Sequence, residues 1–125
     1  ISSSADAADI LRYLWEEGKL ELVEQFKVLF LNRSNKVIAV YNISTGGITG
    51  TVADPRLILS AALKINAVSM ILSHNHPSGS LKPSKADEEL TYKIKCAAAY
   101  FDMKVLDHIV LTEEGYFSFA DEGLM

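Results

Sequence analysis

"ILSHNHPSGSLKPSKADEEL", residues 71–90, joins an apolar run to the start of a helix through a loop rich in Pro, Gly and Ser. The run VSMILS at 68–73 is almost wholly apolar, which is typical of a strand covered on both faces. His74 and His76 stand where this run ends, and the residues from Ser84 onward predict a long helix. The segment therefore predicts a strand–loop–helix unit with two histidines at the entrance of the loop.

The sequence on either side of this unit alternates between helical and strand patterns. SSSADAADIL opens a helix that is N-capped by a Ser and should end near Gly18, and Asp54 and Pro55 open a second helix within ADPRLILSAALKINA. The third helix is SKADEELTYKIKCAAAYFD. Besides VSMILS, strands are expected in ELVEQFKVLFLN, KVIAVYNIS, ITGTV, KVLDHIVLT and GYFSFAD. The order α-β-β-β-α-β-α-β-β predicts an α/β fold in which helices pack on a mixed sheet.

The composition is that of a single packed domain with an acidic balance. Hydrophobic residues make up 49% of the 125 residues, enough for one core. The formal net charge of −4 opposes binding of duplex DNA by phosphate neutralisation alone, since such binding needs a concentrated basic face. Four lysines near the histidine loop are interpreted as the solvated side of a helix and its approach: Lys82, Lys85, Lys93 and Lys95.

Targeting signals and cysteine content bear on the compartment. The apolar runs are much shorter than the about 20 residues that span a bilayer, and the N-terminus lacks a basic region followed by an apolar segment. We expect a cytoplasmic protein without membrane contact. The first residue is Ile1 rather than Met, which suggests a piece of a longer chain. The single cysteine, Cys96, cannot form an internal disulfide, and its place in TYKIKCAAAYF predicts a small buried apolar residue.

His74, His76 and Asp87 form a candidate metal-ligand set. Residues two apart in an extended segment point the same way, so the two imidazoles should converge at the tip of the strand. Asp87 falls in the first turn of the next helix, where a carboxylate gains from the helix dipole. Zinc takes imidazole nitrogen and carboxylate oxygen, and three protein ligands leave a fourth position for water, as in catalytic zinc sites.

A structural interpretation of part of this pattern remains open. In SKAD, residues 84–87, Ser84 is also a plausible N-cap to which Asp87 reaches back, a variant of the capping box. A cap explains neither histidine, so the combination favours the metal site. A hydrolase also needs a proton shuttle and a donor for the oxyanion. Glu21 and Glu24 are candidates for the shuttle, position alone does not choose between them, and Ser84 is the candidate donor.

The pattern Glu … His-x-His-(seven residues)-Ser-x-x-Asp resembles the JAMM, or MPN+, metalloprotease motif. The finer detail HNHPSG, at 74–79, resembles the RadC branch of that family, as do FLN in the first hairpin, PR at 55–56 and LDHIVL at 106–111. The resemblance covers about residues 20–125 and leaves 1–19 as a helix and linker from an upstream region. It implies a curved mixed β-sheet flanked by helices, MPN/JAB-like, with a layout similar to that of cytidine deaminases.

The resemblance also implies a role for each matching residue. His74, His76 and Asp87 would bind a catalytic zinc ion, and Ser84 would hydrogen-bond the oxyanion or bound water. The proton shuttle would be Glu24, because RadC-like sequences usually place an acid two residues before the aromatic of the first strand.

Several other polar and aromatic residues are interpreted as structural. His108 alternates with apolar residues, which favours a satisfied histidine in or beside the sheet over a fourth ligand. Asp107 would orient it or support a metal histidine. Asn75 is expected to pin its loop through backbone hydrogen bonds. The later aromatic residues are expected in the core and its packing: Tyr92, Tyr100, Phe101, Tyr116, Phe117 and Phe119.

Three functions follow from these observations. The leading hypothesis is a zinc-dependent hydrolase that cleaves a peptide or isopeptide bond in an unknown protein or peptide substrate. The second is a DNA-associated binding module with a structural metal site, suggested by the name "DNA repair protein" that RadC-like proteins bear. Full-length members typically carry a helix-hairpin-helix-like region ahead of this domain, which would supply contacts to DNA or repair partners. The third is a metal-dependent phosphodiesterase, although many nucleases use two metals. A homo-oligomer paired through exposed strand edges is a further expectation.

Overall fold

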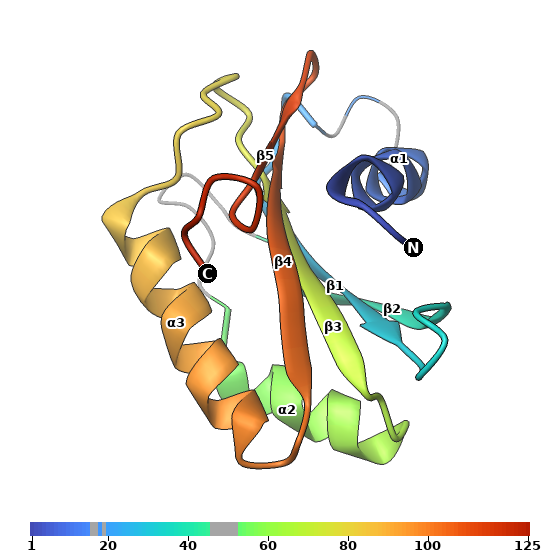
Figure 1. Cartoon of the computed structure of the whole chain (residues 1–125). Coiled ribbons are helices and arrows are strands. Elements are labelled where there is room, and N and C mark those ends of the chain that lie inside the picture. Colours follow the sequence, from blue (N-terminus) through green and yellow to red (C-terminus); the bar gives the residue numbers. More distant parts are fainter. Residues whose placement is uncertain (16–17, 19, 46–52) are drawn as a thin grey trace.

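The computed structural model describes residues 1–15, 18, 20–45 and 53–125. Its strands form a five-stranded sheet of order β2-β1-β3-β4-β5 (Figure 1). The expected α/β class and mixed sheet are confirmed. The expected strand ITGTV, at 48–52, lies outside the described residues. The elements are α1 (Ser4–Leu14), β1 (Gln25–Leu31), β2 (Val37–Thr45), α2 (Pro55–Lys64), β3 (Ser69–Asn75), α3 (Lys85–Ala99), β4 (Lys104–Leu111) and β5 (Tyr116–Ser118).

The central strand β3 has neighbours of opposite direction. It pairs antiparallel with β1 and parallel with β4, and α3 makes the crossover between β3 and β4. Strands β2 and β5 complete the sheet with antiparallel pairs. Because β1 runs against β3, the start of β1 lies at the same end of the sheet as the carboxyl end of β3. Ligands of α/β proteins commonly bind outside the carboxyl ends of parallel strands.

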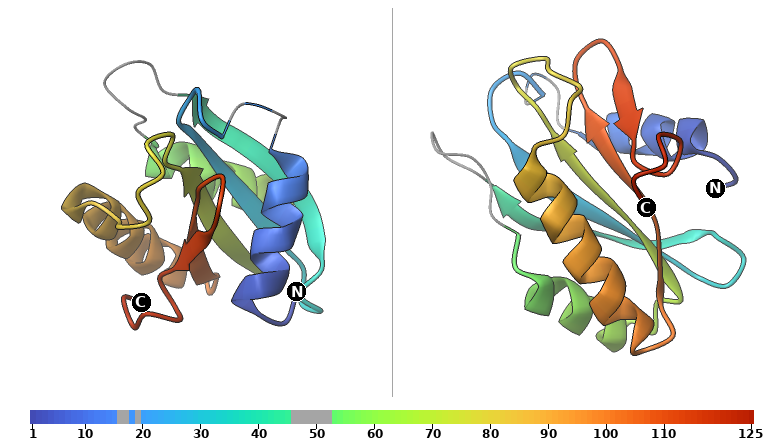
Figure 2. Two further views of the ribbon diagram at one scale, coloured as in Figure 1. Left: turned by 90° about the horizontal axis from the view of Figure 1, so that it is seen from above. Right: turned by 60° about the vertical axis from the view of Figure 1, so that its left-hand side comes forward.

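Helices cover both faces of this sheet (Figure 2). Helices α2 and α3 pack on one face, and α1 packs on the other. Strand β1 is buried along its whole length, because alternate side chains enter different cores. Phe26, Val28 and Phe30 belong to the core under α2 and α3, whereas Leu29 and Leu31 belong to the core under α1. The helix that the sequence assigns to residues 1–19 thus shares a core with β1, β3 and β4.

The ends of the helices follow from capping side chains. Ser3 caps α1, Asp54 caps α2 with Pro55 in the first turn, and Ser84 caps α3 through a capping box with Asp87. Helix α1 ends at Leu14, earlier than expected, and Trp15 leaves the helix in extended backbone.

Two expectations about burial were wrong. Cys96 is exposed, because α3 buries Thr91, Ile94 and Ala98 and turns Cys96 outward. Most of the aromatic residues assigned to the core are also exposed: Tyr92, Tyr100, Phe101 and Tyr116. Phe119 is fully buried, as expected.

Two further features concern possible surfaces. The four lysines near the histidine loop are exposed, in agreement with a solvated helix side. Among the helices that the structure describes, none is both long and apolar enough to cross a membrane.

Candidate metal centre

Three segments meet at the upper end of the sheet in Figure 1. These are the carboxyl end of β3 with the loop after it, the first turn of α3, and the residues just before β1. The register pairs Phe26 of β1 with His74 of β3. Glu24 therefore enters beside His76, although fifty residues separate the two segments in sequence.

The two imidazoles of the loop entrance converge. The Nε2 atoms of His74 and His76 lie 2.9 Å apart. His74 is buried, whereas the His76 side chain is 15% exposed. The Nδ1 of His76 lies 2.8 Å from the Ser80 carbonyl oxygen, which only accepts, so Nδ1 carries the proton. A neutral His76 therefore presents its Nε2 lone pair to His74.

Asp87 closes the group from the first turn of α3. Its Oδ2 lies 3.3 Å from Nε2 of His74 and 3.6 Å from Nε2 of His76. The same Oδ2 accepts the backbone N–H of Ser84 at 2.8 Å, and the Ser84 hydroxyl accepts the backbone N–H of Asp87 at 3.0 Å. Asp87 therefore takes part in the helix cap and also lies next to the histidines, because the cap orients its carboxylate.

The three donor atoms lie near the spacing of ligands around one ion. Atoms bound at about 2.0–2.2 Å to a tetrahedral zinc ion lie about 3.3–3.6 Å apart. Oδ2 of Asp87 lies within this range from Nε2 of His74 and Nε2 of His76, at 3.3 and 3.6 Å, and the 2.9 Å between the two Nε2 atoms is somewhat shorter. The donor set is two imidazole nitrogens and a carboxylate oxygen, so the residues fit a divalent cation of this type.

Of the two candidate shuttle residues, Glu24 lies at this group. Its Oε1 is 4.0 Å from Nε2 of His76, and donor atoms of Glu24, His74 and His76 all lie within 4.8 Å of one another. Glu24 is thus close enough to be either a ligand or a neighbour of the ion, and Asp87 is the nearer carboxylate. Glu21 is exposed and lines a separate pocket of about 200 Å³ with Glu113 and Glu114.

Asn75 fixes the segment that carries Glu24. Its side chain is fully buried and points away from the two histidines that flank it. Its Oδ1 accepts the backbone N–H of Gln25 at 2.7 Å, and its Nδ2 donates to the carbonyls of Leu20 and Val23 at 3.0 and 2.8 Å. Asn75 therefore makes the expected backbone hydrogen bonds, but it pins the approach to β1 rather than its own loop.

The charged groups of the site perturb one another. Burial raises the pKa of the Asp87 carboxyl, but the adjacent imidazoles of His74 and His76 outweigh this effect and hold that pKa well below its usual range. The hydrogen bond to Asp87 raises the pKa of His76, although burial opposes it. Asp87 is therefore ionised near neutral pH and supplies the negative charge that a cation needs.

His108 contacts the site from beneath. Its Nε2 lies 2.7 Å from Nδ1 of His74, and its Nδ1 lies 2.6 Å from Oγ1 of Thr91. Burial lowers the pKa of His108 well below its usual value, so His108 is neutral. Both of its nitrogens are used, in agreement with a satisfied histidine rather than a further ligand.

Sequence reasoning missed Thr91. The only signal is a hydroxyl residue on the stripe of α3 that also buries Ile94 and Ala98. Asp107, the residue expected to support a histidine ring, bonds instead to backbone N–H groups of His108 and Ala120 and to the hydroxyl of Ser118.

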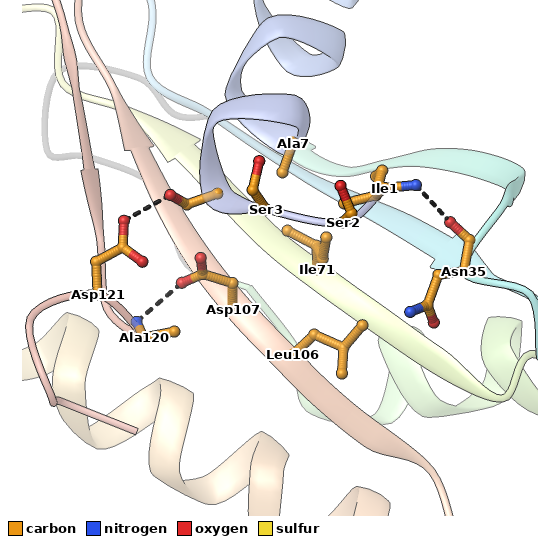
Figure 3. Close-up of a pocket in the computed structure, with 11 residues that line it drawn as sticks. Ile1, Ser2, Ser3, Ala7, Asn35, Ile71, Leu106, Asp107, Ala120 and Asp121 are labelled. Atoms are coloured by element: carbon orange, nitrogen blue, oxygen red, sulfur yellow. Dashed lines mark hydrogen bonds between the residues drawn. The ribbon is translucent and has the colours of Figure 1, made fainter.

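Asp107 belongs to a different pocket on the α1 side of the sheet. Figure 3 shows its carboxylate on the wall of this pocket, bonded to the Ala120 N–H, with Ile71 and Leu106 beside it. The pocket has a volume of about 200 Å³ and is closed on one side by the first residues of the chain. The candidate metal centre and this pocket are thus separate features on opposite faces of the sheet.

Comparisons with known proteins agree on one family. A family model described as RadC-like JAB domain matches residues 1–124. A "UPF0758 protein" of Flavobacterium johnsoniae is 50% identical over 124 residues, which are 99% of this chain and 53% of that protein. A "UPF0758 protein" of Porphyromonas gingivalis is 46% identical over 82% of this chain and 45% of that protein, and "UPF0758 protein FN0909" of Fusobacterium nucleatum is 40% identical over 93% and 50%. The chain thus spans about half the length of these curated relatives. On these matches, the chain belongs to the RadC-like JAB domain family.

Proposed function

We propose that this domain is a zinc-dependent hydrolase that cleaves a peptide or isopeptide bond. The observation that supports this most directly is the convergence of His74, His76 and Asp87, whose donor atoms lie 2.9–3.6 Å apart. A zinc ion held there would polarise a substrate carbonyl and lower the pKa of a bound water to near 7. A single cation with one near carboxylate suits amide hydrolysis better than phosphodiester cleavage, for which many enzymes use two metals.

The remaining groups have complementary roles in this proposal. Glu24, whose Oε1 is 4.0 Å from Nε2 of His76, takes the proton from the attacking water and passes it to the leaving amine. Ser84 keeps its hydroxyl proton because its Oγ acts as the acceptor in the helix cap, so the hydroxyl is able to donate to the oxyanion. His76 is the more exposed histidine, so substrate approaches from its side.

The first test is metal binding. A chelator first removes any bound metal from the protein. We then expect the protein to take up about one zinc ion per chain, measured by elemental analysis after dialysis. Asp87→Ala and His76→Ala should remain folded by circular dichroism and lose this stoichiometric zinc. A wild-type protein that takes up no zinc on titration would contradict the assignment of the site.

The second test is turnover on peptide and isopeptide-linked substrates. Glu24→Gln should retain zinc and lose on the order of 10²–10⁴ in rate, because a general acid–base contributes that much. Glu21→Gln provides the comparison, and a larger loss for Glu21→Gln would exchange the roles of the two glutamates. If Glu24→Gln also loses its zinc, Glu24 is a metal ligand rather than the proton shuttle. Equal rates with and without zinc would contradict the proposed function.

A further inference from the structure

We propose that His108 and Thr91 are positioning residues of the metal centre, which hold His74 in the tautomer whose Nε2 lone pair faces the cation and which link His74 to Asp87. The inference rests on the proposed function only in requiring that His74, His76 and Asp87 bind a metal. It assigns a role to two buried polar side chains that do not reach the reacting atoms.

The four residues form one continuous chain of hydrogen bonds. Nδ1 of His74 lies 2.7 Å from Nε2 of His108, and Nδ1 of His108 lies 2.6 Å from Oγ1 of Thr91. Oγ1 of Thr91 lies 2.7 Å from the backbone carbonyl oxygen of Asp87. The chain therefore begins behind one candidate ligand, on β3, and ends on the backbone of another, on α3.

The last bond sets the direction of the whole chain. A carbonyl oxygen only accepts, so the Thr91 hydroxyl donates to Asp87. Its oxygen then accepts the Nδ1 proton of His108. Because His108 is fully buried, its imidazole stays neutral, which leaves its Nε2 as an acceptor. That Nε2 accepts the Nδ1 proton of His74, and the Nε2 of a neutral His74 is left with a lone pair.

A second carbonyl sets His76 in the same way. Its Nδ1 donates to the Ser80 carbonyl oxygen, so its Nε2 also carries a lone pair. Two lone pairs then face each other across 2.9 Å, with the ionised Oδ2 of Asp87 at 3.3 and 3.6 Å. Such an arrangement is repulsive unless a proton or a metal ion lies among the three atoms. The hydrogen-bond chain thus prepares the ligands for a cation before it arrives.

The surroundings of His108 keep this chain fixed. His108 is fully buried and Thr91 is 2% exposed. The His108 ring stacks on Phe119, with centroids 4.6 Å apart, and meets the edge of Phe26 at 5.5 Å. Among the residues that the structure describes, His74 and Thr91 are the hydrogen-bond partners of the two ring nitrogens. Metal ligands are commonly oriented by such outer hydrogen bonds, and losing one typically costs 10–100-fold in metal affinity.

The experiment compares Thr91→Val with Thr91→Ser in the zinc-loaded protein. Valine keeps the shape of threonine and removes the hydroxyl, whereas serine keeps the hydroxyl. We expect Thr91→Val to bind zinc about 10–100-fold more weakly in competition with a chromophoric chelator. Thr91→Ser should restore affinity to within a few-fold of wild type. A purely structural role of Thr91 would change the unfolding midpoint of the metal-free protein without this difference in zinc affinity.

A second measurement needs no variant. In the zinc-loaded wild-type protein, ¹⁵N NMR of the imidazole nitrogens should show protons on Nδ1 of both His74 and His108 and none on Nε2 of His108. A proton on Nε2 of His108, or a Thr91→Val affinity within twofold of wild type, would overturn the proposal. A wild-type protein that binds no zinc would contradict the proposed function. Normal zinc binding in the wild type together with either of the two results above would contradict only the role of His108 and Thr91.

Discussion

At the scale of single residues, the site depends on backbone segments that side chains bring together. Asn75 stands between the two histidines, and its amide makes three hydrogen bonds to backbone groups that flank Glu24. His74 and His76 thus face the site, whereas the side chain of Asn75, between them, holds the backbone around Glu24. In the proposed mechanism, the distance between Glu24 and the histidines is therefore set by Asn75.

Asn75→Asp should separate metal binding from proton transfer. The ionised aspartate keeps an acceptor for Gln25 but offers no donor to the carbonyls of Leu20 and Val23. Leaving a buried acceptor unpaired costs on the order of 1–3 kcal/mol in unfolding free energy. We expect zinc stoichiometry to persist while the rate of peptide hydrolysis falls, because Glu24 shifts.

The double variant of Asn75→Asp with Glu24→Gln is the control for this prediction. If Asn75 acts through Glu24, the double variant should be about as slow as Glu24→Gln alone. A further loss in rate equal to the separate effect of Asn75→Asp would show that the two residues act independently. Stability by urea unfolding and zinc content complete the measurement.

The residues of the site differ in how visible they are in the sequence. His74, His76 and Asp87 stand out because their spacing matches extended backbone followed by a helix start. His108 and Thr91 are thirty-four and seventeen residues from the groups they bond to across the fold, and each looks like an ordinary core position. Their link to the site depends on tertiary packing, which local patterns do not encode.

At the scale of elements, α3 shows how the phase of a helix can be misjudged. Cysteine is usually buried, which led to the expectation that Cys96 lies inside. The buried face is instead set by Thr91, Ile94 and Ala98. Tyr92 and Tyr100 are one turn away from Cys96 on either side and share its exposed face. The periodicity of the larger apolar side chains is thus a better guide than the average burial of one residue type.

Cys96→Ser and Ile94→Ala test this phase. The exposed Cys96 should be replaced with a change in unfolding free energy within about 0.5 kcal/mol. Ile94 is fully buried, so truncation should cost about 2–5 kcal/mol by denaturant unfolding. The Cys96 thiol should also react with a thiol reagent in the native protein without denaturant. A protected thiol, or a large loss for Cys96→Ser, would contradict the exposed position.

Most elements were predictable because their signals are local. The three helices carry capping residues at their starts, and β3 contains the short apolar run MIL, residues 70–72. The burial of β1 on both faces was less evident, because Gln25 and Lys27 suggest a solvated face. The cover comes from α1, and Lys27 lies over the Trp15 ring at 5.2 Å. Burial of a strand by a helix from another part of the chain leaves no pattern in the sequence of the strand itself.

At the scale of the whole molecule, topology explains why the site lies where it does. The parallel β3–α3–β4 crossover places the start of α3 at the end of β3, and the antiparallel β1 adds its own start to the same end. The element order predicted a mixed sheet, but the order of strands in the sheet was not derivable from the pattern. The position of Glu24 beside the histidines, which distinguishes it from Glu21, could therefore be seen only once the strand order was known.

The stability of the metal-free protein should depend on pH through two histidines whose pKa values shift in opposite directions. Burial lowers the pKa of His108, so below about pH 6.5 the unfolded chain binds a proton that the folded chain does not, and stability falls as the pH falls. The hydrogen bond to Asp87 raises the pKa of His76, so its contribution is complete below about pH 6.5 and is lost as the pH rises through the folded pKa.

Together these two groups predict a maximum of stability near pH 6.5 in the presence of a chelator. Each proton changes the unfolding free energy by at most about 1.4 kcal/mol per pH unit. Urea unfolding between pH 5 and pH 8 measures the curve, and His76→Gln should flatten its alkaline side while leaving the acid side in place. A curve that rises steadily from pH 5 to pH 8 would contradict the raised pKa of His76. Because the alkaline loss reflects the proton that Asp87 holds on His76, its presence would show that the carboxylate and the imidazole interact in solution without a metal.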